Sequence, residues 1–277
     1  MKTSISSYSF AAMGEPQIKL IEKAKAIGFD AIEFTDIEPY GGKNELDTAK
    51  LLRETADKVG IEISCNSVGA DLLGGNIKAE IARIKAKVDV AEALGVKMMR
   101  HDATFRTPSG GKGFINVVGG IADACREITE YAAEKGIKTM VENHGMFCQD
   151  SDRLELLINT VDHPNFGMQL DVGNFLCVDE NPGTAVGRCA KYAFNVHIKD
   201  FIYKSGEAGY PGDGWIHTRG GSYIRGTIAG HGIVPIKQCV EAVKRAGYNG
   251  YLTLEFEGLE QIDIALKLGY EYMRTLV

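Results

Sequence analysis

The sequence has no apolar run that could cross a bilayer and no surplus of basic residues. A membrane-spanning helix needs about 20 consecutive apolar residues, and polar or charged residues interrupt every shorter apolar run of this 277-residue chain. Lysine and arginine total 31 against 37 aspartates and glutamates, so the formal net charge is −6. Such a chain carries no electrostatic signature of binding to a phosphate backbone or an anionic surface. We expect neither nucleic acid nor a membrane as a partner.

Paired cysteines are also missing. The six cysteines are scattered without a Cys-x-x-Cys spacing, and a chain of this size does not need disulfides for stability. We interpret them as reduced thiols, most of them small core residues. The opening stretch, MKTSISSYSFAAMG, is interrupted by Ser and Tyr and does not read as a signal peptide. These features predict a cytoplasmic protein.

Proline is scarce, with 7 residues, whereas glycine is abundant, with 33. Glycine therefore makes up about 12% of the chain, against a typical usage near 7%. Many glycines follow helical patterns and precede apolar runs, as in AIGFDAIEF, EALGVKMM and AEKGIKTMVE. Glycine just past a helix adopts the left-handed conformation at little cost, so the pattern indicates repeated helix-to-strand turns.

Short apolar runs rich in β-branched residues alternate with longer segments whose apolar residues recur every three or four positions. The alternation predicts eight strands, and 277/8 ≈ 35 residues per unit is the size of a βα repeat in a closed parallel barrel. We therefore predict one α/β domain over residues 1–277, a (β/α)8 TIM barrel. An open doubly wound sheet is the alternative, but the turn AAMGEPQ after the first strand lacks the Gly-rich phosphate fingerprint. The predicted strands are 4–10, 31–35, 61–66, 96–101, 138–143, 167–171, 194–199 and 251–256.

Four consecutive predicted strands each end in a residue that can bind a metal. They are Glu142 in MVENHG, Asp171 in QLDVGN, His197 in NVHIKD and Glu255 in LTLEFEG. Catalytic residues of parallel barrels lie at the carboxyl ends of the strands, and carboxylates flanked by apolar residues are costly to bury without a cation. A single carboxylate at a strand end is more often solvated or paired with a base, but four in succession favour a metal. Two Glu, one Asp and one His suit Mn²⁺, Mg²⁺, Co²⁺ or Zn²⁺.

With these motifs, GFDAIEF near the start and GYNGYLTLEFEG near the end, the sequence resembles the sugar phosphate isomerase/epimerase family. These xylose-isomerase-like barrels include ketose 3-epimerases, hydroxypyruvate isomerase, inosose dehydratase and the large subunits of C-glycoside deglycosidases. The resemblance implies that Glu142, Asp171, His197 and Glu255 hold the metal, with Mn²⁺ as the first candidate. It also implies that Glu142 and Glu255 exchange protons with opposite faces of the substrate. A homo-oligomer is implied by the resemblance alone, and a second subunit stays open.

Moving a proton next to a carbonyl requires a base at the carbon and an electrophile at the oxygen. We therefore expect a metal-dependent isomerase or epimerase that acts on a small carbohydrate, a keto-sugar or sugar phosphate, through a metal-stabilised enediolate. The close alternative is a lyase that expels a β substituent after the same proton abstraction. A more distant one is a sugar-binding or partner-dependent subunit without turnover. Asn174 replaces the His that ketose 3-epimerases commonly carry there, which weakens the free-ketose reading and, with the negative charge, argues against the AP-site endonucleases.

Other residues near the strand ends are candidates for substrate contact. His144 either caps its strand or acts as a further catalytic acid or base. Arg100 and His101 end the fourth strand, where one can meet a substrate hydroxyl and the other can pair with a barrel carboxylate. Lys199 lies two residues past His197, on the same strand face.

The segment 201–233 is the longest stretch without helical periodicity, is rich in glycine and holds the only tryptophan. Connections longer than about 15 residues are uncommon and usually functional. We expect an active-site loop that covers the substrate, with docking of a second subunit or a mobile surface excursion as alternatives. The predicted substrate-binding residues of the whole chain are His101, Asn174, Lys199, Trp215, Arg219 and His231.

Overall fold

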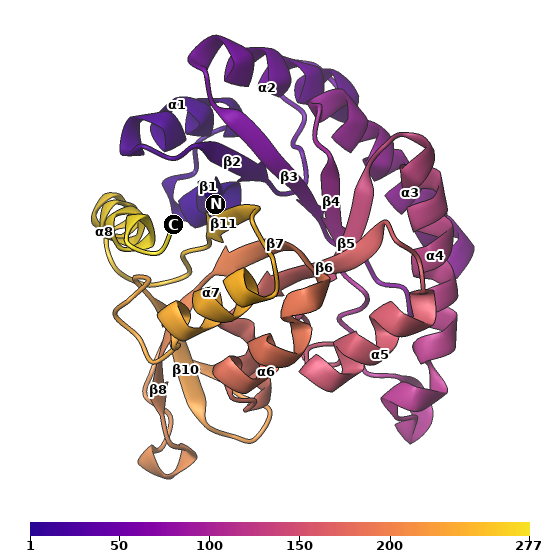
Figure 1. The fold of residues 1–277 in the computed structure, drawn as a ribbon, viewed down its shortest axis with the longest axis vertical. Coiled ribbons are helices and arrows are strands. Elements are labelled where there is room, and N and C mark those ends of the chain that lie inside the picture. The colour runs from indigo at the N-terminus through magenta and orange to yellow at the C-terminus, as the bar shows by residue number, and fades with distance from the viewer.

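The computed structural model describes all residues from 1 to 277 and confirms the closed barrel (Figure 1). Eight parallel strands pair in the order β1-β11-β7-β6-β5-β4-β3-β2, with β1 closing the ring against β2. Each strand matches a predicted one except that residues 7–10 leave the first strand and enter a short 3-10 helix. The barrel strands are β1 (Lys2–Ser6), β2 (Ala31–Phe34), β3 (Glu62–Val68), β4 (Met98–His101), β5 (Lys138–Glu142), β6 (Phe166–Asp171), β7 (Ala193–Ile198) and β11 (Tyr251–Leu254).

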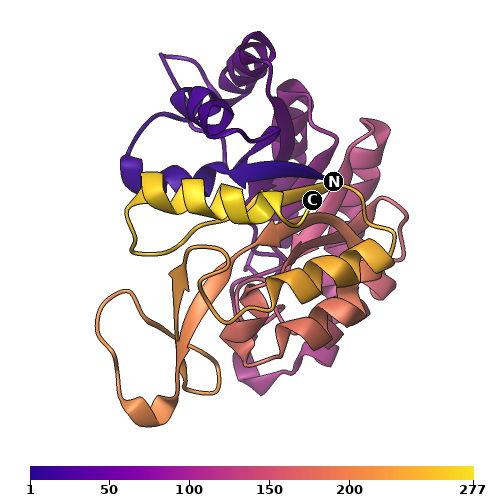
Figure 2. The same ribbon diagram turned by 60° about the vertical axis from the view of Figure 1, so that its left-hand side comes forward.

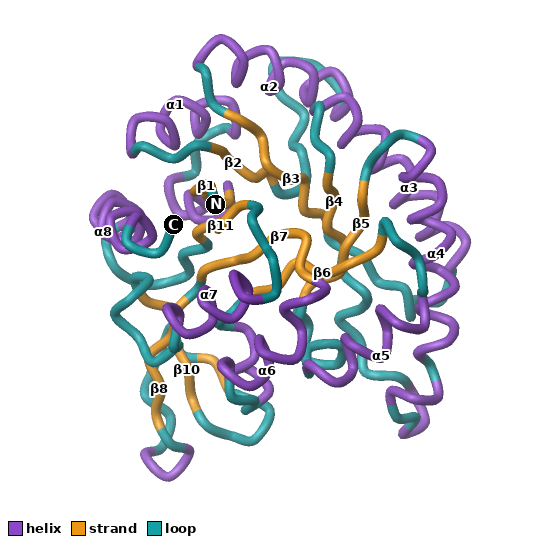
Figure 3. Tube along the Cα trace, in the orientation of Figure 1, coloured by secondary structure: helices purple, strands orange, loops and turns teal.

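Eight helices surround the barrel, one after each barrel strand (Figures 1 and 3). The apolar stripe of the third helix confirms the periodicity argument, because Ile81, Ile84, Val88 and Ala91 are all buried. That helix ends at Gly95, whose φ of 76° is the left-handed conformation that glycine adopts easily. No helix is long and apolar enough to cross a membrane. The helices are α1 (Gln17–Ile27), α2 (Glu45–Val59), α3 (Ile77–Leu94), α4 (Val118–Glu134), α5 (Ser151–Val161), α6 (Pro182–Cys189), α7 (Ile236–Arg245) and α8 (Ile262–Arg274).

Short 3-10 helices occupy several connections, and the first of them shapes the mouth of the barrel. The chain turns there directly after β1, so Tyr8 stands at the carboxyl ends of the strands instead of extending the sheet. All six cysteines are buried and unpaired, as expected for small core residues. The 3-10 helices are η1 (Ser7–Met13), η2 (Ser109–Gly111), η3 (Phe114–Asn116), η4 (Asn174–Val178), η5 (Ala190–Tyr192) and η6 (Gly206–Ala208).

The segment after β7 is not the irregular loop that its composition suggested. It forms a three-stranded antiparallel sheet in the order β8-β10-β9, from β8 (Asp200–Lys204), β9 (Ile216–His217) and β10 (Tyr223–Thr227). We call residues 200–227 the arm, and Figure 2 shows it projecting from the barrel. The Asp200 carboxylate anchors its base by accepting hydrogen bonds from four backbone N–H groups, those of Phe201, Gly230, Gly232 and Val234. Frequent glycines had masked the strand alternation in the sequence.

Candidate metal centre

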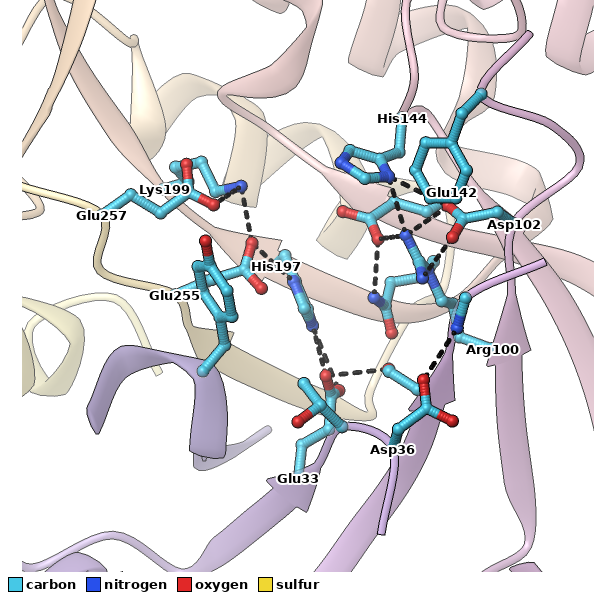
Figure 4. A pocket seen from close by; sticks show the side chains of 16 residues that line it. Glu33, Asp36, Arg100, Asp102, Glu142, His144, His197, Lys199, Glu255 and Glu257 are labelled. Atoms are coloured by element: carbon cyan, nitrogen blue, oxygen red, sulfur yellow. Dashed lines mark hydrogen bonds and ion pairs between the residues drawn. The ribbon is translucent and has the colours of Figure 1, made fainter. Parts of the chain in front are cut away.

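The four predicted metal ligands converge at the carboxyl ends of neighbouring strands (Figure 4). Glu142 and Asp171 end β5 and β6, His197 lies near the end of β7, and Glu255 directly follows β11. The sheet register sets Asp171 directly beside His197. One ligand atom from each residue lies within 4.8 Å of all the others. Strand order and register thus gather residues that are far apart in the sequence.

Two of these ligands present buried atoms that have no hydrogen-bond partner. Asp171 accepts backbone hydrogen bonds from Gly173 and Asn174 through Oδ1, at 2.7 and 2.8 Å, while its Oδ2 has none. His197 Nδ1 is also unpartnered. Orphaned buried polar atoms are rare and call for an explanation such as an ion. Both atoms face the other two carboxylates, so this donor set fits a hard or borderline divalent cation.

Lys199 is the only lysine in the centre, and it pairs with the ligands themselves. Its Nζ lies 2.6 Å from Glu255 Oε2, 3.4 Å from Asp171 Oδ2 and 3.2 Å from Glu257 Oε1. Burial alone lowers the pKa of Lys199, but the surrounding carboxylates outweigh it and hold the pKa well above its ordinary value. Burial raises the pKa of Glu255, and Lys199 and His197 together hold it well below normal. Both groups are therefore charged in this environment.

Arg100 forms the opposite wall of the centre together with Asp102 and His144. Arg100 Nη2 lies 2.6 Å from both Glu142 Oε2 and Asp102 Oδ1, which confirms that it pairs with a barrel carboxylate. His144 Nδ1 lies 2.9 Å from the same Asp102 oxygen. Burial lowers the pKa of His144, but its hydrogen bond to Asp102 and the charge of Glu142 raise it above the ordinary value. The wall thus presents an imidazole with a raised proton affinity to the pocket.

Glu33, in β2, is a member of the centre that the sequence analysis missed. Its side chain is fully buried, and both carboxylate oxygens lie 3.1 Å from His197 Nε2. Burial lowers the pKa of His197, whereas the carboxylates of Glu33 and Glu255 raise it well above normal. An acid inside the apolar run AIEF was the one available signal. The contact crosses the barrel interior between β2 and β7, which are not neighbours in the ring, and no local motif records it.

These residues line a pocket of about 260 Å³ at the barrel mouth. Figure 4 shows Glu255 and Lys199 on one side of it, and Glu142, Arg100 and Asp102 on the other. Of its 16 lining residues only two are hydrophobic, and six are carboxylates. The lining consists of Tyr8, Glu33, Thr35, Asp36, Ser67, Gly69, Arg100, Asp102, Phe105, Glu142, His144, Gln169, His197, Lys199, Glu255 and Glu257.

The predicted substrate-binding residues divide into two groups. Lys199 lines the pocket, and Asn174 lies against it, donating to Glu142 Oε1 at 3.1 Å and accepting from Lys199 Nζ. His101, Trp215, Arg219 and His231 do not line the pocket. His101 is fully buried, with its ring beside that of Phe166, since neighbouring residues of a strand face opposite ways and Arg100 takes the pocket side.

The other three residues belong to the arm or follow it, and none of them lines the pocket. The Trp215 ring lies under the cationic ends of Lys204 and Arg225. Arg219 pairs with Asp150, and His231 is exposed after the last strand of the arm. The physical reason is that residues 200–227 fold into their own sheet, which holds Trp215 and Arg219 away from the lining, and His231 lies beyond that sheet.

The molecule is a closed βα barrel with a carboxylate and imidazole cluster, which could hold a metal ion, at the carboxyl ends of its strands. The chain belongs to the xylose isomerase-like TIM barrel family, whose model matches residues 21–275. This confirms the resemblance that the sequence motifs indicated.

Individual relatives are distant in sequence but close in fold. The chain is 22% identical to an inosose dehydratase of Lacticaseibacillus casei over 144 residues, which is 50% of this chain and 46% of that relative. The D-psicose 3-epimerase of Clostridium cellulolyticum H10, solved with D-tagatose, has a TM-score of 0.79 and 16% identity, covering 100% of this chain and 99% of that one. A Mycobacterium smegmatis barrel of this family, solved with magnesium, has a TM-score of 0.75 and 17% identity, covering 99% and 96%. At such identities the two structures share the fold with this chain.

Proposed function

We propose that this chain is a divalent-metal-dependent isomerase or epimerase of a keto-sugar. The observation that carries the proposal is the cluster of Glu142, Asp171, His197 and Glu255, in which Asp171 Oδ2 and His197 Nδ1 have no hydrogen-bond partner. A bound divalent ion supplies Lewis-acid stabilisation of the negative charge that develops on the carbonyl oxygen. The remaining steps fall to side chains of this chain.

Glu142 and Glu255 are the proposed acid and base. They lie on opposite sides of the pocket, so one reaches a carbon-bound proton from one face while the other reaches the opposite face (Figure 4). Three donors orient Glu142, namely Arg100, Gln169 and Asn174. The lowered pKa of Glu255 keeps it in the carboxylate form that a base requires, although the same shift reduces its proton affinity. The orientation of the substrate decides which glutamate acts first.

His144 and Lys199 are proposed to serve the substrate oxygens. His144 lines the pocket and is hydrogen-bonded to the Asp102 carboxylate, so it can move a proton between neighbouring oxygens of an enediolate. Lys199 carries a positive charge to the other side of the pocket. Its proposed role is to hold a substrate hydroxyl or the carbonyl oxygen beside Glu255.

The charges in the pocket support an uncharged substrate over a sugar phosphate. Arg100 is already paired with Glu142 and Asp102, and Lys199 with Glu255 and Glu257. Six carboxylates line the pocket against these two cations. A phosphate dianion would have to break one of these buried ion pairs and lie among like charges. We therefore favour a free keto-sugar or keto-cyclitol of about one ring, which suits a small polar pocket.

A lyase is the second candidate, supported by the partial similarity to inosose dehydratase and by the Asp102–His144 pair. After a glutamate takes the proton next to the ketone, the bond from the β carbon to its hydroxyl breaks. His144 would donate the proton that turns the departing hydroxide into water. Both reactions share the first step, so the choice depends on whether carbon or a leaving oxygen receives the next proton.

Proton NMR in D₂O tests the proposal and separates its outcomes. The metal-loaded protein is incubated with free ketoses, ketose phosphates, inososes and 3-oxo-glycosides. Deuterium uptake with an isomeric product supports the isomerase, and loss of water or of an aglycone supports the lyase. A protein that leaves every compound unchanged contradicts both and favours a sugar-binding or partner-dependent subunit. Glu142→Gln should abolish turnover, whereas Glu130→Gln, on the exposed face of α4, should not change it.

A further inference from the structure

We propose that Glu33 is a positioning residue that selects Nδ1 of His197 as the metal-binding nitrogen and, through two buried amides, orients Glu142. The inference rests on the proposed metal-dependent function, but it concerns residues beneath the centre that belong to no ligand motif. Figure 4 shows His197 between Glu33 and Glu255. The carboxylate of Glu33 would then orient two of the four proposed ligands, His197 and Glu142.

The surroundings of Glu33 are unusual for a buried carboxylate. Its side chain is 0% exposed, and its only ion-pair partner is His197. Ser67 Oγ donates to Oε1 at 2.9 Å, and Asn195 Nδ2 donates to Oε2 at 2.9 Å. A buried carboxylate without a lysine or arginine partner needs hydrogen-bond donors at both oxygens. His197 Nε2 must therefore supply an N–H as well.

That requirement decides which nitrogen of His197 is free to bind a cation. An unprotonated Nε2 would turn its lone pair toward two carboxylate oxygens 3.1 Å away, which is repulsive. In a neutral imidazole one nitrogen donates and the other accepts, so an N–H at Nε2 leaves the lone pair on Nδ1. Nδ1 is the atom without a hydrogen bond, 3.6 Å from Glu255 Oε2 and 4.0 Å from Asp171 Oδ2. A carboxylate behind a metal-binding histidine fixes both its tautomer and its ring orientation.

The side-chain amides of Asn195 and Gln169 connect Glu33 to Glu142 by hydrogen bonds. Because Asn195 gives one N–H to Glu33, the direction of its amide is set, and its Nδ2 also donates to Gln169 Oε1 at 3.0 Å. Gln169 must then turn its own Nε2 toward Glu142 Oε2, 3.2 Å away. Thr253 holds the other end of the Asn195 amide by donating to Oδ1 at 3.3 Å. The four polar residues Glu33, Asn195, Gln169 and Thr253 are fully buried, so water does not compete for these bonds.

Titration calorimetry of the full chain with Mn²⁺ tests the proposal. Glu33→Gln keeps the shape of the side chain but replaces one acceptor oxygen by a donor, and should weaken Mn²⁺ binding by about 10- to 100-fold, the range for such supporting groups. Ser67→Ala is the matched control, because it removes one donor to Glu33 but keeps the carboxylate against His197. It should weaken binding far less.

Long-range ¹H–¹⁵N spectra of the histidine rings with Mg²⁺ bound report the tautomer of His197 directly. This tautomer would not change if Glu33 only stabilised the fold. The wild type should show His197 protonated at Nε2, and Glu33→Gln should show a mixture of tautomers. Glu33→Asp is a second variant, because its shorter side chain keeps a carboxylate but places it farther from His197. It should bind Mn²⁺ with intermediate affinity. Wild-type affinity and the wild-type tautomer in a folded Glu33→Gln protein would overturn the proposal while leaving the metal centre intact. Absence of Mn²⁺ binding by the wild type would instead defeat the proposed function.

Discussion

Asp171 Oδ2 and His197 Nδ1 lie 4.0 Å apart, and neither atom has a hydrogen-bond partner. Two ligand atoms that are each about 2.1 Å from one ion can be up to about 4.2 Å apart. The separation is therefore within the range that a single cation could bridge. The same cation would offset the charge of Glu142 and Glu255, which complete the cluster.

Metal binding should stabilise the folded protein. Only the folded chain assembles the four ligands, so an ion at 100 times its dissociation constant adds about 2.7 kcal/mol. For a chain of this size that corresponds to a rise in Tm of about 5–10 °C. Differential scanning fluorimetry with Mn²⁺, Mg²⁺, Co²⁺ and Zn²⁺, followed by a chelator, measures the shift. Asp171→Asn should lose it, and a wild-type Tm that none of the four ions changes would contradict the metal centre.

Asp102→Asn should impair turnover without weakening the metal. The substitution keeps the shape of the residue but removes the negative charge that orients His144 and raises its pKa. We expect kcat to fall by about 100-fold, the scale of general acid–base catalysis. The Mn²⁺ affinity should stay near the wild-type value, because Asp102 is linked to the proposed ligands only indirectly. Arg100 lies between Asp102 and Glu142 and pairs with both. Equal losses of kcat and of metal affinity would show that the wall supports the metal and not the proton transfer.

Lys199→Met should destabilise the metal-free protein more than the metal-loaded one. Without the ammonium group, Asp171 and Glu255 keep their buried charges unneutralised, and breaking a buried pair in this way costs about 3–5 kcal/mol. A divalent ion restores positive charge at the same oxygens, so Mn²⁺ should recover much of the loss. Chemical denaturation with and without Mn²⁺ gives the two values. An equal loss in both states would mean that Lys199 contributes by packing alone.

The buried cysteines should be unreactive in the folded chain. Burial raises the pKa of Cys148, Cys189 and Cys239 to about 12 and that of Cys177 to about 11. A thiol reagent at pH 8 should therefore modify them only after unfolding. Because unfolded thiols ionise at lower pH than these folded ones, the free energy of unfolding should fall as the pH rises above about 9. Fast labelling of native protein, or stability that is flat from pH 8 to 10, would contradict the raised pKa values.

The convergence of Glu142, Asp171, His197 and Glu255 could be predicted because each of them lies at the end of an apolar strand, and in a parallel barrel all strand ends share one rim. Contacts between side chains of strands that are not neighbours in the barrel could not be predicted. Glu33 is separated from His197 by 164 positions, and only the closed ring brings their side chains together inside the barrel. His101 was misleading because it is adjacent to Arg100, and sequence alone does not say which of two consecutive strand residues faces the pocket. The register decides that, and it selects Arg100.

The arm was hidden for a different reason. Its strands are short, and the one at the edge of its sheet, β9, has two residues. Glycines interrupt the alternation of side chains that would have marked a sheet. The base of the arm also makes a long-range contact, in which Asp200 accepts hydrogen bonds from backbone N–H groups about 30 positions later in the chain. Such a contact leaves no periodic trace in the sequence.

Asp200→Asn should therefore loosen the arm while leaving the barrel folded. Each oxygen of the Asp200 carboxylate accepts two backbone N–H groups, Oδ1 from Phe201 and Val234 and Oδ2 from Gly230 and Gly232. An amide at this position sets its own NH₂ group against one of these pairs, which leaves two buried donors unsatisfied at about 1–3 kcal/mol each. We expect faster proteolytic cleavage within the arm and a lower Tm. Asp213→Asn, an exposed position in the same segment, should behave as the wild type. If both variants resist protease as well as the wild type does, the arm is ordered by its own sheet and not by Asp200.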